Sequence, residues 1–133
     1  LQMEVGEQAT PFEHRSFGQE LALCQRYYYL HASGASDFMG SGDMYVATQL
    51  NCNIHFPTPM RAAPSLVATN GTNYYLAYGG GTSTNMTNAW NLFVPQENCA
   101  TLYGTPTSTV TAGSGMRVLS NDSSASVAFD AEL

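Results

Sequence analysis

The chain has 133 residues, a length that fits a single domain able to bury a hydrophobic core without disulfide or metal staples. It contains four arginines, no lysine and ten acidic residues, for a formal net charge of −6. Because phosphate and anionic lipid surfaces are bound by clustered Lys and Arg, this balance argues against nucleic acid and against a membrane surface as partners.

Charged residues make up only 11% of the chain, so Ser, Thr, Asn, Gln and Tyr must supply the polar surface. Two interpretations fit this composition. One is an extracellular or virion β-protein that resists proteases through compactness, and the other is a polar, aromatic surface suited to glycans. No apolar run approaches the twenty or so residues of a membrane-spanning helix, so no membrane insertion is expected.

Residues 1–10 begin with a short alternation of apolar and polar side chains, which is typical of a strand. Because this strand has no partner close in sequence, we expect it to be the end of an upstream domain or shaft. The chain begins at Leu1, and we expect it to be a C-terminal piece of a longer protein.

Residues 11–30 have the only clear helical period in the chain. An apolar stripe recurs at spacings of four, three and four residues, formed by Phe17, Leu21, Cys24 and Tyr28. Ser16 and Gln19 have the spacing of a capping box, which predicts that the helix starts there. We expect it to give way to a strand between Arg26 and Tyr28, and a helix this short must pack on something to be stable.

The segment from Met44 to Phe56 has a period of two, in which a mostly apolar set of residues alternates with a set that is polar from Gln49 onward. This pattern predicts one long strand with a core face and a polar face. Asn70-Gly71 predicts a hairpin between strands at 65–69 and 74–78. Residues 79–88 are expected to form a loop. Further short strands are predicted at 90–94, 99–103, 108–112, 116–119 and 125–133.

Seven or eight short strands after a helix predict an all-β fold, which we interpret as a jelly-roll-like antiparallel β-sandwich over residues 31–133. The three cysteines form no CxxC pair, and their odd number leaves at least one thiol free or bonded between chains. Cys24 and Cys52 lie in apolar patterns, and we expect both to be buried free thiols.

Three blocks of sequence resemble a family of bacteriophage tail-fibre and related virion proteins. They are LQMEVGEQATPFEHRSFGQELALCQRYYY at the start, HFPTPMRAAPSL in the middle and SVAFDAEL at the end. The blocks keep the order and spacing seen in that family and cover about 50 of the 133 residues. Residues 66–124 match no block of the family.

The resemblance implies a C-terminal tail-fibre domain on the virion, assembled as a homotrimer at the tip that meets the host. Its helix would pack against two copies of itself, through Phe17, Leu21, Cys24 and Tyr28. The function implied is attachment to a host cell-surface polysaccharide, capsular or lipopolysaccharide, without hydrolysis. The alternative is a purely structural domain that trimerises and terminates the fibre.

No catalytic motif stands out in the chain, and no enzyme activity or cofactor is expected. Arrangements such as GxSxG, HExxH or a Cys–His pair are absent from the sequence. The three histidines lie far apart, so no metal site is expected within one chain, although a trimer can gather three copies of one His on its axis.

The candidate ligand-binding residues are aromatic side chains beside amide-rich loops. Such a combination offers a platform for the apolar face of a sugar ring and hydrogen bonds for its hydroxyls. The set is Tyr75, Trp90, Tyr103, Asn73, Asn85 and Asn88. The alternative for the aromatic residues is the core, and alternation in residues 74–78 predicts that Tyr74, Leu76 and Tyr78 face it while Tyr75 does not.

Overall fold

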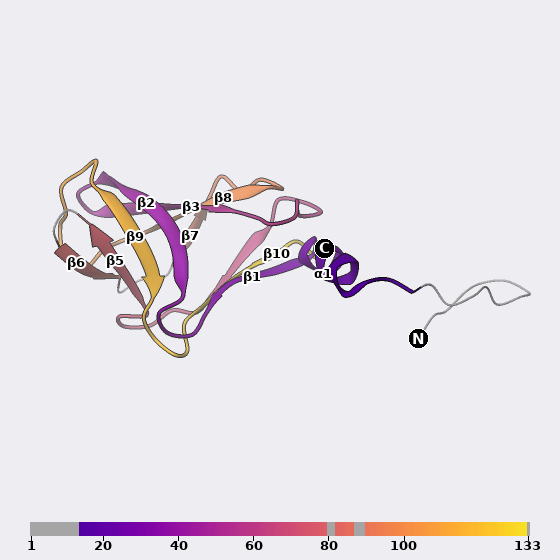
Figure 1. Ribbon diagram of the computed structural model, residues 1–133. Coiled ribbons are helices and arrows are strands. Elements are labelled where there is room, and N and C mark those ends of the chain that lie inside the picture. Colours follow the sequence, from indigo (N-terminus) through magenta and orange to yellow (C-terminus); the bar gives the residue numbers. More distant parts are fainter. Residues whose placement is uncertain (1–13, 80–81, 87–89, 133) are drawn as a thin grey trace, which may run out of the picture.

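The computed structural model describes residues 14–79, 82–86 and 90–132 (Figure 1). This part of the chain contains one helix and ten strands. The helix is α1 (Phe17–Gln25), and the strands are β1 (Tyr28–Ser33), β2 (Phe38–Val46), β3 (Gln49–His55), β4 (Ser65–Ala68), β5 (Tyr75–Gly79), β6 (Thr82–Met86), β7 (Asn91–Phe93), β8 (Cys99–Gly104), β9 (Gly115–Ser120) and β10 (Ser126–Asp130).

The strands form two antiparallel sheets. The smaller has the order β1-β10-β4, and the larger has the order β6-β5-β9-β2-β3-β8-β7. The expected all-β fold with one short helix is confirmed. Residues 1–10, expected to end an upstream strand, lie outside the described residues, and the expected boundary between 30 and 31 falls inside β1.

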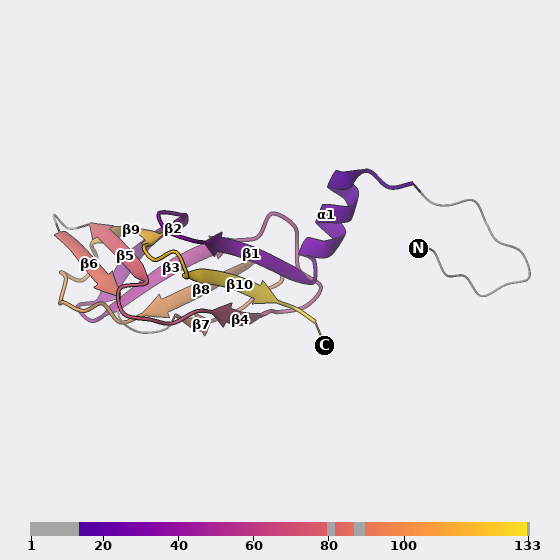
Figure 2. The same cartoon turned by 90° about the horizontal axis from the view of Figure 1, so that it is seen from below.

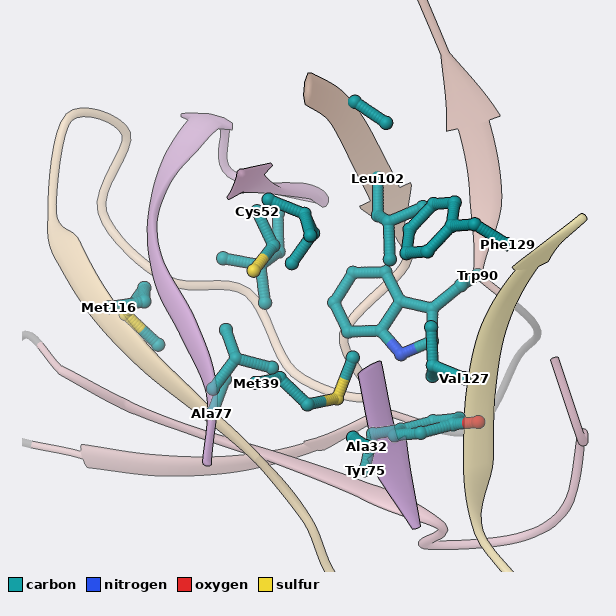
Figure 3. Close-up of a cluster of buried hydrophobic side chains, with 14 of the residues drawn as sticks. Ala32, Met39, Cys52, Tyr75, Ala77, Trp90, Leu102, Met116, Val127 and Phe129 are labelled. Atoms are coloured by element: carbon teal, nitrogen blue, oxygen red, sulfur yellow. The ribbon is translucent and has the colours of Figure 1, made fainter. Parts of the chain in front are cut away.

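One hydrophobic core joins the two sheets. Val127 and Phe129 of the small sheet belong to the same buried cluster as Cys52 and Leu102 of the large sheet (Figure 3). The rings of Phe56 and Phe129 meet edge to face with their centroids 4.9 Å apart. Burial of these side chains on both sheets supplies the main favourable term in folding.

The helix begins with the predicted capping box. The backbone N–H of Gln19 donates to Ser16 Oγ at 3.3 Å, and the backbone N–H of Ser16 donates to Gln19 Oε1 at 3.0 Å. The last helical residue is Gln25, and Arg26 caps the end, as expected. Tyr28 is therefore a residue of β1 and not of the helix, which corrects its place on the helical stripe.

The segment predicted as one long strand from Met44 to Phe56 is a hairpin, which is a correction. Strands β2 and β3 are antiparallel neighbours, with Met44 opposite Leu50 and a turn at Ala47 and Thr48. Residues directly opposite each other in a hairpin point to the same face of the sheet. The period of two in the sequence is therefore the same before and after this turn, and the pattern does not show where the first strand ends. The turn itself has no Gly, Pro or Asn to reveal it.

The hairpin predicted at Asn70-Gly71 is also wrong. Strand β4 pairs with β10 in the small sheet, whereas β5 pairs with β6 and β9 in the large sheet. The N–H of Tyr74 still donates to Gly71 O at 3.3 Å, so a local turn forms there. That turn carries the chain from one sheet to the other instead of folding it back on itself.

The side chains of β5 that point toward the core are the opposite set from the one predicted. Tyr75 and Ala77 are buried, whereas Tyr78 is 41% exposed. Aromatic and aliphatic residues occupy both faces of this strand, so alternation alone cannot tell which face the core takes. Two further differences concern residues 108–112, which form no strand, and the expected loop at 79–88, in which residues 82–86 pair with β5 as β6.

Candidate functional site

Two of the predicted ligand-binding aromatics, Tyr75 and Trp90, lie in the core. Tyr75 is 1% exposed and Trp90 is 3% exposed, and their rings meet edge to face at 5.7 Å (Figure 3). The Tyr75 hydroxyl lies 2.7 Å from Thr69 O and 3.0 Å from Ser126 O, to which it donates. Burial raises the pKa of Tyr75. Neither ring can offer a face to a ligand, so the interpretation of both as a sugar platform is replaced by the alternative, core packing.

The three predicted asparagines are not gathered with Tyr103. Asn73 is exposed in a turn at φ 60°, and its carbonyl accepts from Asn121 Nδ2 at 2.9 Å. Asn85 lies on β6, where its backbone pairs with Leu76 of β5, and β6 is at the opposite end of the large sheet from Tyr103. Asn88 lies outside the described residues. The predicted set therefore does not form one site.

Tyr103 is the predicted aromatic that stays accessible. It is half-buried on β8, and its ring meets that of Phe93 on β7 edge to face, with centroids 6.3 Å apart and planes at 89°. Phe93 is 57% exposed. An aromatic side chain this exposed beside a second one is a candidate binding surface.

Phe93 was not among the predicted site residues, although the sequence held a signal for it. It alternates with Trp90 and Leu92, which predicts that it points away from the core. Val94 directly after it has φ 47°, a left-handed conformation that is rare for a β-branched residue. The chain leaves the sheet at this point, so Phe93 sits at the end of an edge strand.

Polar side chains surround the aromatic pair on the outward side of the large sheet. In one row, Asn51 of β3 lies opposite Tyr103, which lies opposite Asn91 of β7. In the next row, Asn53 lies opposite Thr101, which lies opposite Phe93. We call this surface the outer face: it comprises Gln49, Asn51, Asn53, His55, Asn91, Phe93, Thr101 and Tyr103, and continues over β2, β9 and β5 through Ser41, Asp43, Gly115, Arg117 and Tyr78.

Hydrogen bonds between side chains orient the amides of the outer face. Thr101 Oγ1 donates to Asn53 Oδ1 at 2.7 Å, and Gln49 Nε2 donates to Asn51 Oδ1 at 3.1 Å. The Gln49, Asn51 and Asn53 amides keep further donors and acceptors for a ligand. The polar alternation at 49–55 predicted one polar face, and the structure directs these residues away from the core.

A second exposed surface is apolar and lies at the helix. None of the nine residues of α1 is buried, and Phe17 is 82% exposed. Leu21 and Cys24 are exposed as well. The prediction that Cys24 is buried is therefore wrong within one chain, whereas the prediction that Cys52 is buried is confirmed. Figure 2 shows the helix at one end of the β-structure, beside the start of β1.

The outward side of the small sheet continues this apolar surface. Leu30 of β1 and Val67 of β4 flank Ala128 of β10, and both flanking side chains are about half exposed. Tyr28 is one row further along, opposite Asp130. Exposed aliphatic side chains on β1 and β4, on either side of the buried Ala128, are typical of an interaction surface.

Arg61 packs against an aromatic ring at the end of the helix. Its guanidinium carbon lies 5.5 Å from the centroid of the Tyr27 ring, and its backbone N–H donates to Arg26 O at 2.8 Å. This contact ties the segment after β3 to the end of the helix.

Neither a metal cluster nor a membrane-spanning helix is found in residues 14–79, 82–86 and 90–132. No group of three or more His, Cys, Asp and Glu side chains in this part of the chain is placed to hold a metal ion. The helix that it contains is too short and too polar to cross a membrane.

Three comparisons with known proteins found no match. The chain matches no protein-family model, no curated protein and no solved structure.

Proposed function

We propose that this chain is the distal domain of a bacteriophage tail fibre, which attaches the virion to a host cell by binding a surface glycan as a homotrimer. The glycan is a capsular polysaccharide or a lipopolysaccharide, and it is bound without hydrolysis. The three sequence blocks at the start, middle and end of the chain support the family. The jelly-roll character expected from the sequence is kept as part of the proposal, with β6 and β7 as edge additions to an eight-stranded core.

The observation that supports glycan binding best is the exposed pair of Phe93 and Tyr103 beside a row of amides. A sugar ring has an apolar C–H face and a rim of hydroxyls. The aromatic pair offers contact area to the first, and Asn51, Asn53 and Thr101 offer donors and acceptors to the second. All of these residues lie on β3, β8 and β7, so a rigid sheet holds them in place.

Binding without hydrolysis agrees with the carboxyl groups of the outer face. Glycosidases use two carboxyls, roughly 5 to 9 Å apart, on either side of the scissile bond. Of the outer-face residues defined above, Asp43 alone has a carboxyl group. In this proposal Asp43 is a hydrogen-bond acceptor and not half of a catalytic pair.

The trimer is supported by the exposed apolar side chains at the helix. A nine-residue helix without a buried side chain is marginal in water, so it needs a partner to cover it. Phe17, Leu21 and Cys24 of three chains would meet on the three-fold axis. Tyr28 and Leu30 of β1 lie beside the helix and would extend that contact.

Three sites on one tip would convert weak single-site binding into firm attachment. After the first site binds, the second and third act at a high effective concentration, and avidity can exceed single-site affinity by a factor of roughly 10² to 10⁴. A shallow, open sheet face that binds each glycan weakly is sufficient under this mechanism.

The proposal is tested by incubating the purified protein with host cells in the presence and absence of the host's purified surface polysaccharide. Light scattering on the same sample gives the oligomeric state, and an assay for new reducing ends measures hydrolysis. A trimer that attaches, is displaced by the polysaccharide and releases no reducing ends supports the proposal.

A second candidate function is a structural domain that trimerises and terminates the fibre without a receptor site of its own. The exposure of the helix and of the small sheet favours this alternative equally well, since both would serve assembly alone. A folded trimer that ignores host cells in the same experiment would support it.

A further inference from the structure

A shallow hollow of about 510 Å³ lies on the outer face, where β5, β9 and β2 run side by side. Its lining includes Ser41, Tyr78, Gly115 and Arg117. Three of its lining residues, Gly42, Gly79 and Gly115, have no side chain, and Gly115 is exposed. A Cβ added at Gly115 would meet no atom within 4 Å.

Arg117 is held at this hollow by an aromatic ring and not by a carboxylate. Its guanidinium carbon lies 5.9 Å from the centroid of the Tyr78 ring, and the two residues are direct partners across β5 and β9. Among the described residues, no carboxylate forms an ion pair with Arg117. Stacking on a ring leaves the in-plane N–H donors of a guanidinium free to bind a planar anion with two parallel hydrogen bonds.

The negative charges around the hollow disfavour a doubly charged anion more strongly than a singly charged one. Asp43 lies opposite Gly115 on β2, one row from Arg117, and the whole chain has a formal net charge of −6. A phosphate group, with its charge of about −1.5 to −2, would be repelled more strongly here than a carboxylate. The Asp43 carboxylate and the Ser41 hydroxyl can instead accept hydrogen bonds from sugar hydroxyls.

We propose that this hollow binds the carboxylate of an acidic sugar residue, with Arg117 as the anion-binding group and Tyr78 as the ring that positions it. The inference rests on the proposed function, because it names the class of glycan that the outer face recognises. Ser41 Oγ and the exposed backbone at Gly115 bind the ring hydroxyls. The glycan is therefore an acidic polysaccharide that contains uronic or sialic acid residues.

Gly115 of the hollow and Tyr103 of the aromatic pair lie in the same row of the outer face. Gly115 lies opposite Asp43, Asp43 opposite Asn51, and Asn51 opposite Tyr103. Three strand spacings separate Gly115 from Tyr103, or about 14 Å at 4.7 to 4.9 Å each. A short oligosaccharide can therefore rest one apolar ring face on Phe93 and Tyr103 and place a carboxylate at Arg117.

The test is an NMR titration of the protein with methyl glycosides of glucuronic, galacturonic and N-acetylneuraminic acid, and with methyl glucoside and methyl galactoside as uncharged counterparts. At least one acidic glycoside should give saturable shifts of the Ser41, Gly115 and Arg117 amides, with an affinity at least tenfold above that of its uncharged counterpart. The inference is overturned if no acidic glycoside moves these amides, or if charged and uncharged sugars bind equally.

Two variants locate the site, and a third serves as a matched control. Arg117→Gln should weaken binding of the acidic glycoside at least tenfold and remove its dependence on salt. Gly115→Leu fills the hollow at a position with ordinary backbone geometry, and it should abolish the shifts. Arg61→Gln removes another ring-stacked guanidinium, over Tyr27, and should change nothing. Unchanged binding by Arg117→Gln would refute the assignment.

The same variants separate this inference from the function on which it rests. If polysaccharide-dependent attachment to host cells survives Arg117→Gln but not the loss of Phe93 and Tyr103, the attachment function holds and the acidic subsite fails. If the trimer ignores host cells while the acidic glycosides still bind at Arg117, the subsite holds and the proposed attachment function fails.

Discussion

Phe93 and Tyr103 meet edge to face across β7 and β8, with ring centroids 6.3 Å apart and ring planes at 89°. The two residues are diagonal neighbours, since Phe93 lies opposite Thr101 and Tyr103 lies opposite Asn91. Because β7 has only three residues and lies at the edge of the sheet, this contact also helps to hold β7 in place.

The first prediction concerns the energy of this contact. We expect a double-mutant cycle with Phe93→Ala and Tyr103→Ala to give a coupling free energy of about 0.5 to 1.5 kcal/mol in favour of folding, as for other edge-to-face pairs. Denaturant unfolding of the wild type, both single variants and the double variant measures it. Additive effects of the two substitutions would show that the rings do not interact in solution.

The second prediction concerns the buried hydroxyl of Tyr75. Tyr75→Phe removes the hydrogen bond to Thr69 O and Ser126 O and should lower the free energy of unfolding by about 1 kcal/mol, the usual net value of such a bond. The control is Tyr78→Phe on the same strand, at an exposed position, which should leave stability unchanged within about 0.5 kcal/mol. Equal effects in the two variants would contradict the assignment of Tyr75 to the core.

The sequence could not predict which side chains of β5 point toward the core. Tyr74, Tyr75, Leu76 and Tyr78 all suit a core, so the period of two was visible while its phase was not. The position of β5 between β6 and β9, with one face against the core that the two sheets share, decides that Tyr75 points inward. Trp90 was placed among the ligand candidates for a different reason, because it lies next to an amide-rich segment of the sequence.

Features set by nearby residues were predicted well. The capping box of Ser16 and Gln19 and the end of the helix at Arg26 depend on contacts within one turn. The polar face at 49–55 was predicted because its amides alternate with Leu50, Cys52 and Ile54. In contrast, β4 pairs with β10, which lies about sixty residues further along the chain. The four residues of β4 indicate a strand, but nothing in them identifies this distant partner.

The third prediction concerns alkaline pH. Burial raises the pKa of the Cys52 thiol to about 12, whereas the unfolded chain has an ordinary thiol near 9. The folded state therefore binds more protons than the unfolded state between these values, so the free energy of unfolding should fall as the pH rises above about 9. The loss should reach a few kcal/mol, on the order of 1.4 kcal/mol for each pKa unit.

Cys52→Ala provides the control for this pH dependence. Denaturant unfolding from pH 7 to pH 11 should show a shallower decline for the variant than for the wild type, although the variant starts from a lower stability because of the cavity it creates. Parallel curves for the two proteins would show that Cys52 is not the group responsible. Tyr29 and Tyr75, whose pKa values are also raised by burial, would then account for the decline.

The fourth prediction concerns assembly. Phe17→Ser and Leu21→Ser together should convert the proposed trimer to a monomer, because they remove apolar side chains from the exposed stripe of the helix. The β-structure should stay folded, since neither residue belongs to the core. Light scattering measures the mass, and circular dichroism checks the fold.

Leu23→Ser is the matched control for assembly, because Leu23 lies on a different side of the same helix and is also partly exposed. This variant should remain a trimer. Cys24 offers a second readout, since its exposed thiol should react with a maleimide in the monomeric variant and be protected in the trimer. A wild-type monomer in dilute solution would contradict the proposed assembly.

The central claim is that the outer face attaches the fibre tip to a host polysaccharide. The most direct test measures binding of the fluorescently labelled protein to host cells, for the wild type and for the Phe93→Ala/Tyr103→Ala variant, with Tyr45→Ala as an exposed aromatic control. We predict that the wild type and Tyr45→Ala bind and are displaced by purified polysaccharide, and that the double variant does not bind. Equal binding by all three proteins, or no binding by a folded wild-type trimer, would contradict the claim.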